Sequence, residues 1–411
     1  MMLEDMKSAR SVAPSTPIRR LAASLLVSML AAALARGGPL QSPVRAPLAP
    51  SSGPVRSLPA KTVEAIETTL TATMSQLGIP ALSVAIGREG TVVFADGYGL
   101  ADVENFVPAK ADTVYRIASI SKLITAVAIL QLVEQGRLDL DAPVRERCPA
   151  FPDKRWPVTA RHLLGHRGGI RTYRDGEQPL TRRFESLQEG LSLFRDDPLE
   201  FEPGTRFLYS TYGYSLLGCV VEGVTGRPYA EAVKESVFAR AGMSRTLPED
   251  VRAVVANRAR GYVRDGQGRL QNAALADMSY KAPGGGISST APDIGRFGLA
   301  LLSAHLLEPA TVEELLQPRD AVAGQSQTWG LALPIDTRGA RPEAWHLGGQ
   351  EGTSTALYMR PDDGTIIAVL TNLEGIPPAL LEVARRLADV VSEPAPSGRA
   401  GTAETGPDVA N

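Results

Sequence analysis

The stretch SISKLITAVAILQLVEQG, residues 119–136, joins a polar start to an almost unbroken apolar run. An apolar run of this length predicts a buried helix over residues 121–135, and Gly136 directly after it is typical of a helix end. Ser119 would then lie at the helix N-terminus, and Lys122 would return to the same face one turn later. The stretch therefore predicts a serine and a lysine side by side where a buried helix begins.

This pairing has a chemical consequence. The positive end of a helix dipole favours a developing negative charge near Ser119. A lysine held among apolar residues tends to lose its proton, and the neutral amine can then accept the proton of the serine. Because a SxxK pattern also recurs by chance, the alternative interpretation is that Ser119 is a helix cap and Lys122 a solvated first-turn lysine.

A second candidate segment contains Tyr209 and Thr211, between a Pro-Gly turn at residues 203–204 and an apolar run. A phenol close to a lysine ammonium can shift toward phenolate and carry protons. The alternative interpretation is a core tyrosine that is hydrogen-bonded to the backbone.

A third candidate segment is His346-Leu347-Gly348-Gly349, which leads into a predicted strand. Glycines allow the edge of a sheet to approach a substrate closely. A backbone N–H of this edge, together with that of Ser119, would form an oxyanion hole. The alternative interpretation is an ordinary glycine-containing turn before a strand.

The order of the remaining elements predicts the fold class. We expect a helix over residues 61–77 and a hairpin of two strands at 81–86 and 91–94. Two further strands are expected at 353–359 and 365–372, followed by a final helix over 378–391. The N- and C-terminal strands can join one antiparallel sheet flanked by helices, with a helical region of about residues 118–284 inserted between them. This is an α+β arrangement.

Composition narrows the function further. The chain has 411 residues, 44% of them hydrophobic, and a formal net charge of -2. It contains no long basic run, so neither nucleic-acid binding nor electrostatic membrane docking is indicated. The absence of HExxH and of any tight histidine cluster in the sequence argues against a metal site, and no cofactor is expected. Cys148 and Cys219 could form one bridge, but two isolated cysteines are more typical of small buried apolar residues.

The N-terminus has the features of an export signal. Arg19 and Arg20 precede an apolar run that ends in Ala33-Leu34-Ala35, a typical cleavage site. We expect a signal peptide over 1–35, a linker over 36–60, one folded domain over 61–391 and a disordered tail over 392–411. The protein would be periplasmic or extracellular. The alternative is an uncleaved N-terminal anchor, and only in that case would the protein contact a membrane.

Taken together, SxxK, Tyr-x-Thr and His-x-Gly occur in an order and spacing that resemble serine β-lactamases and penicillin-binding proteins. The tyrosine and the His-x-Gly form are similar to the branch of class C β-lactamases and D-Ala-D-Ala carboxypeptidases. Within it, the chain looks most like the mitochondrial β-lactamase-like serine proteases of animals and their bacterial relatives. Several flanking segments share the resemblance: Arg116–Lys122, Gly136–Asp141, Leu163–Ile170, Asn257–Arg260 and Met278–Gly286.

The resemblance implies a role for each candidate residue. Ser119 would attack a carbonyl, while Lys122 and Tyr209 would share the proton transfers. The backbone N–H groups of Ser119 and Gly349 would hold the oxyanion. Three further residues would line the site: His346, Gly348 and Thr211. The implied activity is hydrolysis of a small-molecule or peptide substrate, an amide or an ester, through an acyl-serine intermediate.

Two departures from the family pattern limit the substrate. Thr211 stands where many members have Asn, and Leu347 stands where many have Thr or Ser. Because leucine offers no hydrogen bond to a substrate carboxylate, the sequence favours a peptidase or esterase over a true β-lactamase. The alternatives are a catalytically weak scaffold or filament-forming protein and a penicillin-binding protein of the same fold. A homo-oligomer remains open.

Overall fold

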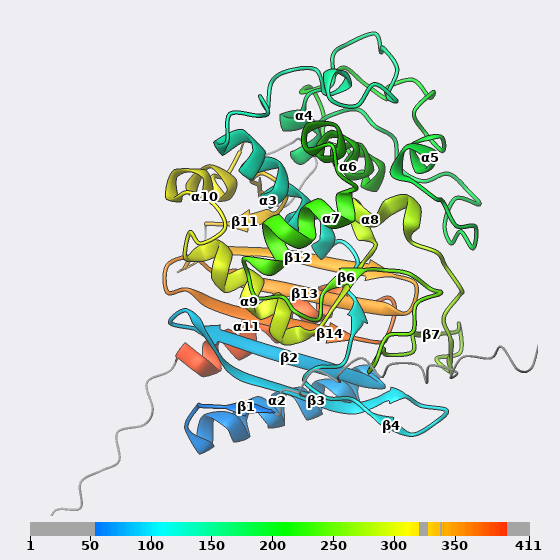
Figure 1. Ribbon diagram of the computed structural model, residues 1–411. Coiled ribbons are helices and arrows are strands. Elements are labelled where there is room, and N and C mark those ends of the chain that lie inside the picture. The colour runs from blue at the N-terminus through cyan, green and yellow to red at the C-terminus, as the bar shows by residue number, and fades with distance from the viewer. Residues whose placement is uncertain (1–53, 320–327, 338, 340, 393–411) are drawn as a thin grey trace, which may run out of the picture. The chain divides into compact units, whose positions relative to one another are not determined.

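The computed structural model describes residues 54–319, 328–337, 339 and 341–392. Among these residues, nine strands form one antiparallel sheet, in the order β1-β3-β2-β14-β13-β12-β11-β10, with β4 paired to β3 (Figure 1). The strands are β1 (Val55–Arg56), β2 (Ala81–Arg88), β3 (Thr91–Asp102), β4 (Val107–Pro108), β10 (Thr328–Trp329), β11 (Pro334–Asp336), β12 (Glu343–Gln350), β13 (Thr353–Arg360) and β14 (Thr365–Thr371).

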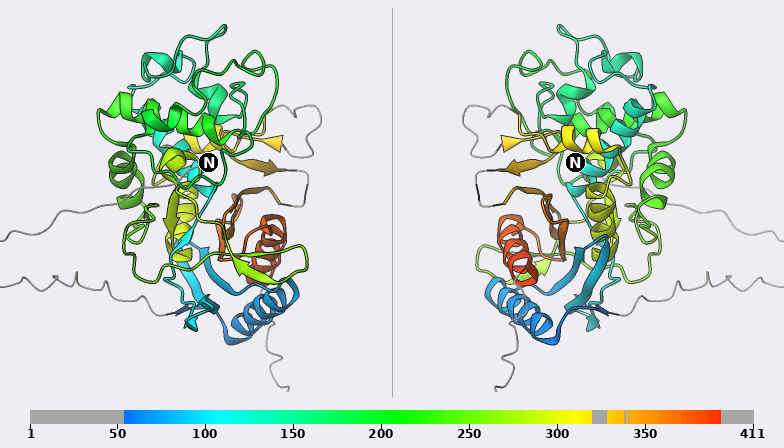
Figure 2. Two further views of the ribbon diagram at one scale, coloured as in Figure 1. Left: turned by 90° about the vertical axis from the view of Figure 1, so that its right-hand side faces the viewer. Right: turned by 90° about the vertical axis from the view of Figure 1, so that its left-hand side faces the viewer.

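Helices cover both faces of this sheet, which is why the central strands β13 and β14 are buried along their whole length. Along β2, Val84 and Ile86 pack against α2 (Ala60–Leu77) and α11 (Pro377–Ser392). The alternate residue Ala85 faces α9 (Ala291–Leu302), where a Cβ added to Gly295 would lie 3.3 Å from the Ala85 methyl group. Small residues on this face therefore let α9 approach the sheet closely, and Figure 2 shows the sheet edge-on between these helices.

A helical region is inserted between β5 (Tyr115–Arg116) and β9 (Ile287–Ser289), as the sequence predicts. Its first helix is α3 (Ile120–Glu134). It is buried from Ile120 to Leu132, in agreement with the apolar run, and it contacts β12 and β13. The other α-helices of this region are α4 (Ala160–Leu164), α5 (Leu187–Leu191), α6 (Thr211–Thr225), α7 (Tyr229–Val233) and α8 (Ala282–Gly285). It also contains two short 3-10 helices, η1 (Val144–Glu146) and η3 (Ser279–Lys281), and a π-helix, η2 (Lys234–Ala239). Three short strands, β6 (Leu247–Pro248), β7 (Tyr262–Arg264) and β8 (Leu270–Asn272), lie in the same stretch, and α10 (Pro309–Leu316) follows α9.

The α+β class and the inserted helical region are confirmed, and two local expectations change. The motif at residues 346–349 leads into the expected strand, β13, but it also lies inside a strand that was not expected, β12, which turns at 351–352 into β13. A two-residue strand, β1, also lies within the segment expected to be a linker, because Val55 pairs with Ala95 of β3. Such short pairings depend on a distant partner and leave no periodicity in the sequence.

The terminal segments are outside this description. The predicted signal peptide, most of the predicted linker and the predicted tail fall on residues 1–53 and 393–411, which lie outside the described residues. None of the described helices combines the length and the apolar character that a bilayer span requires.

The expectation that Cys148 and Cys219 are separate buried thiols is wrong. The two sulfurs form a disulfide across 71 residues, which ties the turn after η1 to the middle of α6. Both side chains are buried, as expected, but pairing over this distance depends on the fold and not on local sequence. The bridge restrains the helical region that carries part of the site described below.

We expect this disulfide to make a large contribution to stability. Closing a loop of 71 residues should stabilise the folded chain by about 4 kcal/mol, because it restricts the unfolded ensemble. Urea unfolding of the oxidised protein should therefore show a free energy of unfolding higher by roughly that amount than in the double variant Cys148→Ala/Cys219→Ala. Addition of dithiothreitol should lower the stability of the parent protein only. Equal stability of the two proteins would show that the bridge adds nothing.

Candidate active site

Ser119 lies in the turn that leads from β5 into α3. The preceding residue, Ala118, has φ = 48°, a left-handed conformation that costs a non-glycine residue conformational energy and is concentrated at functional sites. Ser119 occupies the N-cap position of α3, but its side chain makes no capping hydrogen bond. The hydroxyl is therefore at a helix N-terminus without serving as a cap, which removes the main support for the purely structural interpretation.

Lys122 lies one turn later and is fully buried. Its Nζ is 3.0 Å from Ser119 Oγ, 3.2 Å from Thr211 Oγ1 and 2.6 Å from the carbonyl oxygen of Gly284. Burial, and secondarily the charge of Lys281, hold the pKa of Lys122 well below its usual range. A neutral amine has two donors and one lone pair, so it can donate to Thr211 and Gly284 and accept from the Ser119 hydroxyl.

Tyr209 stands beside this pair, in the segment that enters α6. Lys122 Nζ lies 4.8 Å from the centre of the Tyr209 ring. Burial raises the pKa of the phenol, and a hydrogen bond with Ser119 only partly opposes this effect. The expected shift toward phenolate is therefore wrong, because desolvation of the buried phenol is the largest influence on its pKa. Tyr209 keeps its proton and is placed to donate it.

Thr211 begins α6 and meets the nucleophile from the other side. The N-cap of α6 is Ser210, whose Oγ accepts the N–H of Gly213 and donates to the carbonyl oxygen of Arg171. A Cβ on Gly284 would lie 2.6 Å from Thr211 Cγ2. Only glycine at this position lets α8 approach α6 closely enough for both segments to reach Lys122.

Strand β12 forms the wall beside Ser119. A Cβ on Gly348 would lie 2.2 Å from Thr355 Oγ1 and 2.5 Å from the carbonyl oxygen of Ile117, so any larger residue would push β12 away from the nucleophile segment. Gly349 is exposed and lines the same pocket as Ser119. The side chain of Leu347 instead packs against the cluster beneath α2 and α11, on the other face of the sheet.

His346 lies behind this wall, and burial with the nearby Lys122 lowers its pKa to about 3. Its Nδ1 is 2.8 Å from the carbonyl oxygen of Leu347, so a neutral ring would donate there and leave Nε2 as an acceptor. His346 therefore contributes a neutral, fixed ring near Lys122, and the structure does not place it on the pocket surface formed by the described residues.

The pocket in front of Ser119 has a volume of about 190 Å³. Its described lining comes from the nucleophile, from the segment at 172–178, from the segment that enters α6, from the end of η3, from the end of α8 and from β12: Ser119, Thr172, Tyr173, Gln178, Tyr209, Thr211, Lys281, Gly284, Gly285, Gly349 and Gln350. A larger pocket of about 410 Å³ lies beside β7 and β8 and includes none of the three candidate catalytic residues. The smaller pocket is the one that can present a carbonyl to Ser119.

Sequence reasoning missed several of these lining residues. Tyr173 and Gln178 lie in a loop without a periodic pattern, and Gln350 follows the glycine motif with no distinguishing signal. Lys281 lies within the quoted segment at 278–286, but nothing local indicated that its amine is buried at the pocket.

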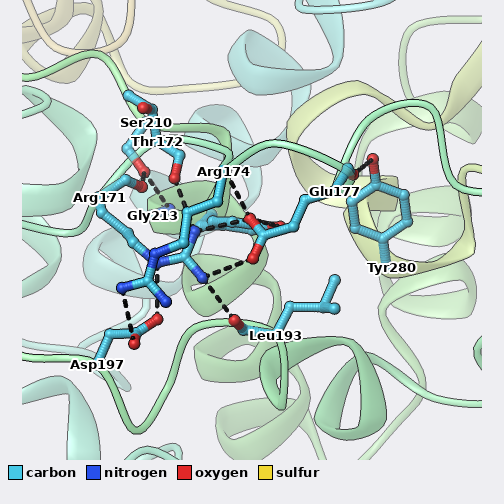
Figure 3. Close-up of polar contacts among 10 residues, drawn as sticks. Arg171, Thr172, Arg174, Glu177, Leu193, Asp197, Ser210, Gly213 and Tyr280 are labelled. Atoms are coloured by element: carbon cyan, nitrogen blue, oxygen red, sulfur yellow. Dashed lines mark hydrogen bonds and ion pairs between the residues drawn. The ribbon is translucent and has the colours of Figure 1, made fainter.

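The loop at 171–178 is held in place by Arg171, which is 5% exposed (Figure 3). Its guanidinium binds Glu177 through two nitrogens at 2.7 and 2.8 Å and Asp197 at 2.6 Å. Tyr212 of α6 donates to the same Glu177 carboxylate at 3.0 Å. Paired, nearly parallel bonds of this kind fix orientation as well as position. The network thus joins the pocket loop to α6, whose N-terminal end positions Thr211 and the preceding Tyr209.

Comparison with known proteins bears on the family and the fold of this chain. The sequence family described as Beta-lactamase matches residues 66–392. The human serine beta-lactamase-like protein LACTB, mitochondrial, is 30% identical over 425 residues, covering 77% of this chain and 78% of that protein. The octameric penicillin-binding protein homologue from Pyrococcus abyssi is similar with a TM-score of 0.68 and 28% identity, covering 80% of this chain and 77% of that one. D-amino acid amidase from Ochrobactrum anthropi shares the fold, with a TM-score of 0.70, 24% identity and coverage of 81% and 99%.

Proposed function

Because this chain belongs to the β-lactamase family, we propose that it is a serine hydrolase that cleaves an amide or ester through an acyl-Ser119 intermediate. One observation carries the proposal. A fully buried lysine with a lowered pKa lies 3.0 Å from the hydroxyl of a serine that is not used as a helix cap. Such a pair is suited to removing the serine proton, because a lowered pKa increases the share of neutral amine that can accept it.

The proposed reaction follows from the contacts. Lys122 accepts the proton of Ser119 as Oγ bonds to the substrate carbonyl carbon, and the backbone N–H groups of Ser119 and Gly349 stabilise the oxyanion. Tyr209 gives its phenolic proton to the leaving group and regains one from the Lys122 ammonium. In the second half, water loses a proton to the same pair as it attacks the acyl carbon, and Ser119 leaves as the alcohol. No cofactor is needed for any of these steps.

The same site supports a peptidase or esterase over a true β-lactamase. The side chain at the strand position after His346 is Leu347, which packs away from the pocket and cannot donate to a carboxylate held along β12.

Export is also part of the proposal. The Cys148–Cys219 disulfide supports a compartment outside the reducing cytosol, since such bridges persist in oxidising surroundings. The octameric Pyrococcus neighbour supports self-assembly of this chain as well.

The direct test is intact-mass spectrometry after brief exposure of the oxidised protein to a small activated ester such as p-nitrophenyl acetate. We expect one acetyl group per chain, and peptide mapping should assign it to Ser119. The buried Ser121 and Ser210 are internal comparisons and should stay unmodified, because their hydroxyls are engaged with backbone carbonyls. No adduct together with no ester turnover would contradict the proposal, and it would favour a scaffold with the same fold.

A further inference from the structure

Lys281 ends η3 directly before α8 and is 2% exposed, yet it lines the pocket in front of Ser119. It is the one charged residue in the described lining, which otherwise consists of hydroxyl, amide, phenol and glycine groups. The pocket therefore presents a single positive charge near the nucleophile.

The charge of Lys281 has no direct partner. Within the described part of the chain, its ammonium forms no hydrogen bond or ion pair and instead lies over the rings of Tyr173 and Tyr280, at 5.3 and 5.4 Å. Burial lowers its pKa to about 8, while the nearby Glu351 raises it and Arg116 lowers it, so the amine is still mostly protonated at pH 7. By contrast, the less buried Lys154 donates to the carbonyl oxygens of two residues. Buried lysines are normally paired.

A second unsatisfied donor lies at the same place. Gln350 of β12 is 7% exposed and also lines the pocket, and its Nε2 has no hydrogen-bond partner among the described residues. Both side chains lie beside Gly285, because a Cβ there would lie 3.3 Å from Gln350 Oε1 and 3.9 Å from Lys281 Cδ. An ammonium and an amide from different elements thus converge on one corner of the pocket.

We propose that Lys281 and Gln350 form a subsite for a substrate carboxylate next to the scissile carbonyl. The two donors match the two oxygens of a carboxylate, and an unpaired cation in a neutral, confined pocket is stabilised by an anion. The subsite lies at the α8 side of the pocket and not at the Leu347 position of β12. It therefore favours substrates that carry a carboxylate. It does not replace the hydrogen bond that a Thr or Ser hydroxyl at position 347 would give to a carboxylate along β12. This inference rests on the proposed function.

Three aryl esters test the subsite. Phenyl pentanoate is neutral, monophenyl glutarate carries a carboxylate on an acyl group of the same chain length, and 3-carboxyphenyl pentanoate carries it on the leaving group. We expect kcat/KM of the parent protein to favour one carboxylated ester over the neutral ester by about 10- to 100-fold, the range of a charge-assisted hydrogen bond. The preferred ester identifies the side of the scissile bond on which the carboxylate binds.

Variants assign this preference to the subsite. Lys281→Met and Lys281→Gln should both lose this preference, measured as the ratio of kcat/KM for the carboxylated ester to kcat/KM for phenyl pentanoate. The ratio cancels any change in the base that follows from removing the Lys281 charge near Lys122. Lys281→Arg should retain most of the preference, and Gln350→Leu should lose about tenfold. Lys234→Met removes an exposed positive charge that is not part of the described pocket lining, and it should leave the preference unchanged. An unchanged preference in both Lys281 variants, or no preference in the parent, would overturn the inference. A fall on phenyl pentanoate equal to that on the acids would instead assign Lys281 to tuning Lys122.

Binding separates this inference from the proposed function. In a Ser119→Ala background, calorimetry should show the preferred carboxylated ester binding at least tenfold more tightly than phenyl pentanoate, and Lys281→Met should remove the difference. Selective binding without any turnover by the parent protein would refute the hydrolase and keep the subsite. Turnover of all three esters at equal rates, with equal binding, would refute the subsite and keep the hydrolase.

Discussion

Replacing Lys122 with methionine should slow acylation of Ser119 by about 10³-fold, the usual contribution of a well-placed proton acceptor. Methionine fills a similar volume in the same apolar surroundings, so we expect a folded protein. The loss should fall on kcat and kcat/KM alike, because the amine acts when the serine proton moves and not when substrate binds. Stopped-flow release of p-nitrophenol from an activated ester measures the acylation step directly.

The pH dependence gives this prediction a sign. The amine must be deprotonated to accept a proton, and its folded-state pKa lies well below the ordinary lysine value. Acylation by the parent protein should therefore be constant above the lowered pKa of Lys122 and fall as the pH drops through it. The Lys122→Met variant should lack this acid limb. A variant that acylates within tenfold of the parent rate, with the limb intact, would assign the base to another group.

The contact between Ser119 and Lys122 could be predicted from sequence because it is local. Residues three apart in a helix lie on one face, and the apolar run at 123–133 predicts the helix itself. The sheet was predictable for a similar reason, since β2, β13 and β14 have turn residues on their flanks. Proximity of Tyr209, Thr211 and Gly349 to this pair required the family resemblance, because no local periodicity connects segments so far apart in the chain.

What could not be predicted depends on burial, which only the fold decides. Tyr209 was expected to approach phenolate, but the desolvation that raises its pKa comes from segments packed around it. Lys281 shows no pattern in sequence that distinguishes it from a solvated lysine, yet the fold leaves it 2% exposed beside Gln350. The pairing of Cys148 with Cys219 is likewise a property of how η1 meets α6.

Ser119→Ala should lower kcat/KM for every ester and amide substrate by at least about 10⁴-fold, because no other group can form the acyl intermediate. The fold should be preserved. Ser119 makes no capping bond, and alanine accepts its backbone conformation, so we expect the free energy of unfolding to change by about 1 kcal/mol or less. Differential scanning calorimetry beside the ester assay checks both parts.

A neighbouring serine provides the matched control. Ser121 is two residues further along α3, is fully buried and donates to the carbonyl oxygen of Ala118 at 2.7 Å. Ser121→Ala should therefore cost about 1 kcal/mol of stability and keep activity within about tenfold. This pair of variants separates chemistry from structure, because the same atom is removed from the same turn in each. If Ser121→Ala lost as much activity as Ser119→Ala, the defect would lie in the conformation of the turn. If only Ser119→Ala lost activity, the hydroxyl beside Lys122 would be the nucleophile. A purely structural role predicts the opposite order, because Ser119 makes no capping hydrogen bond whereas Ser121 is buried and hydrogen-bonded.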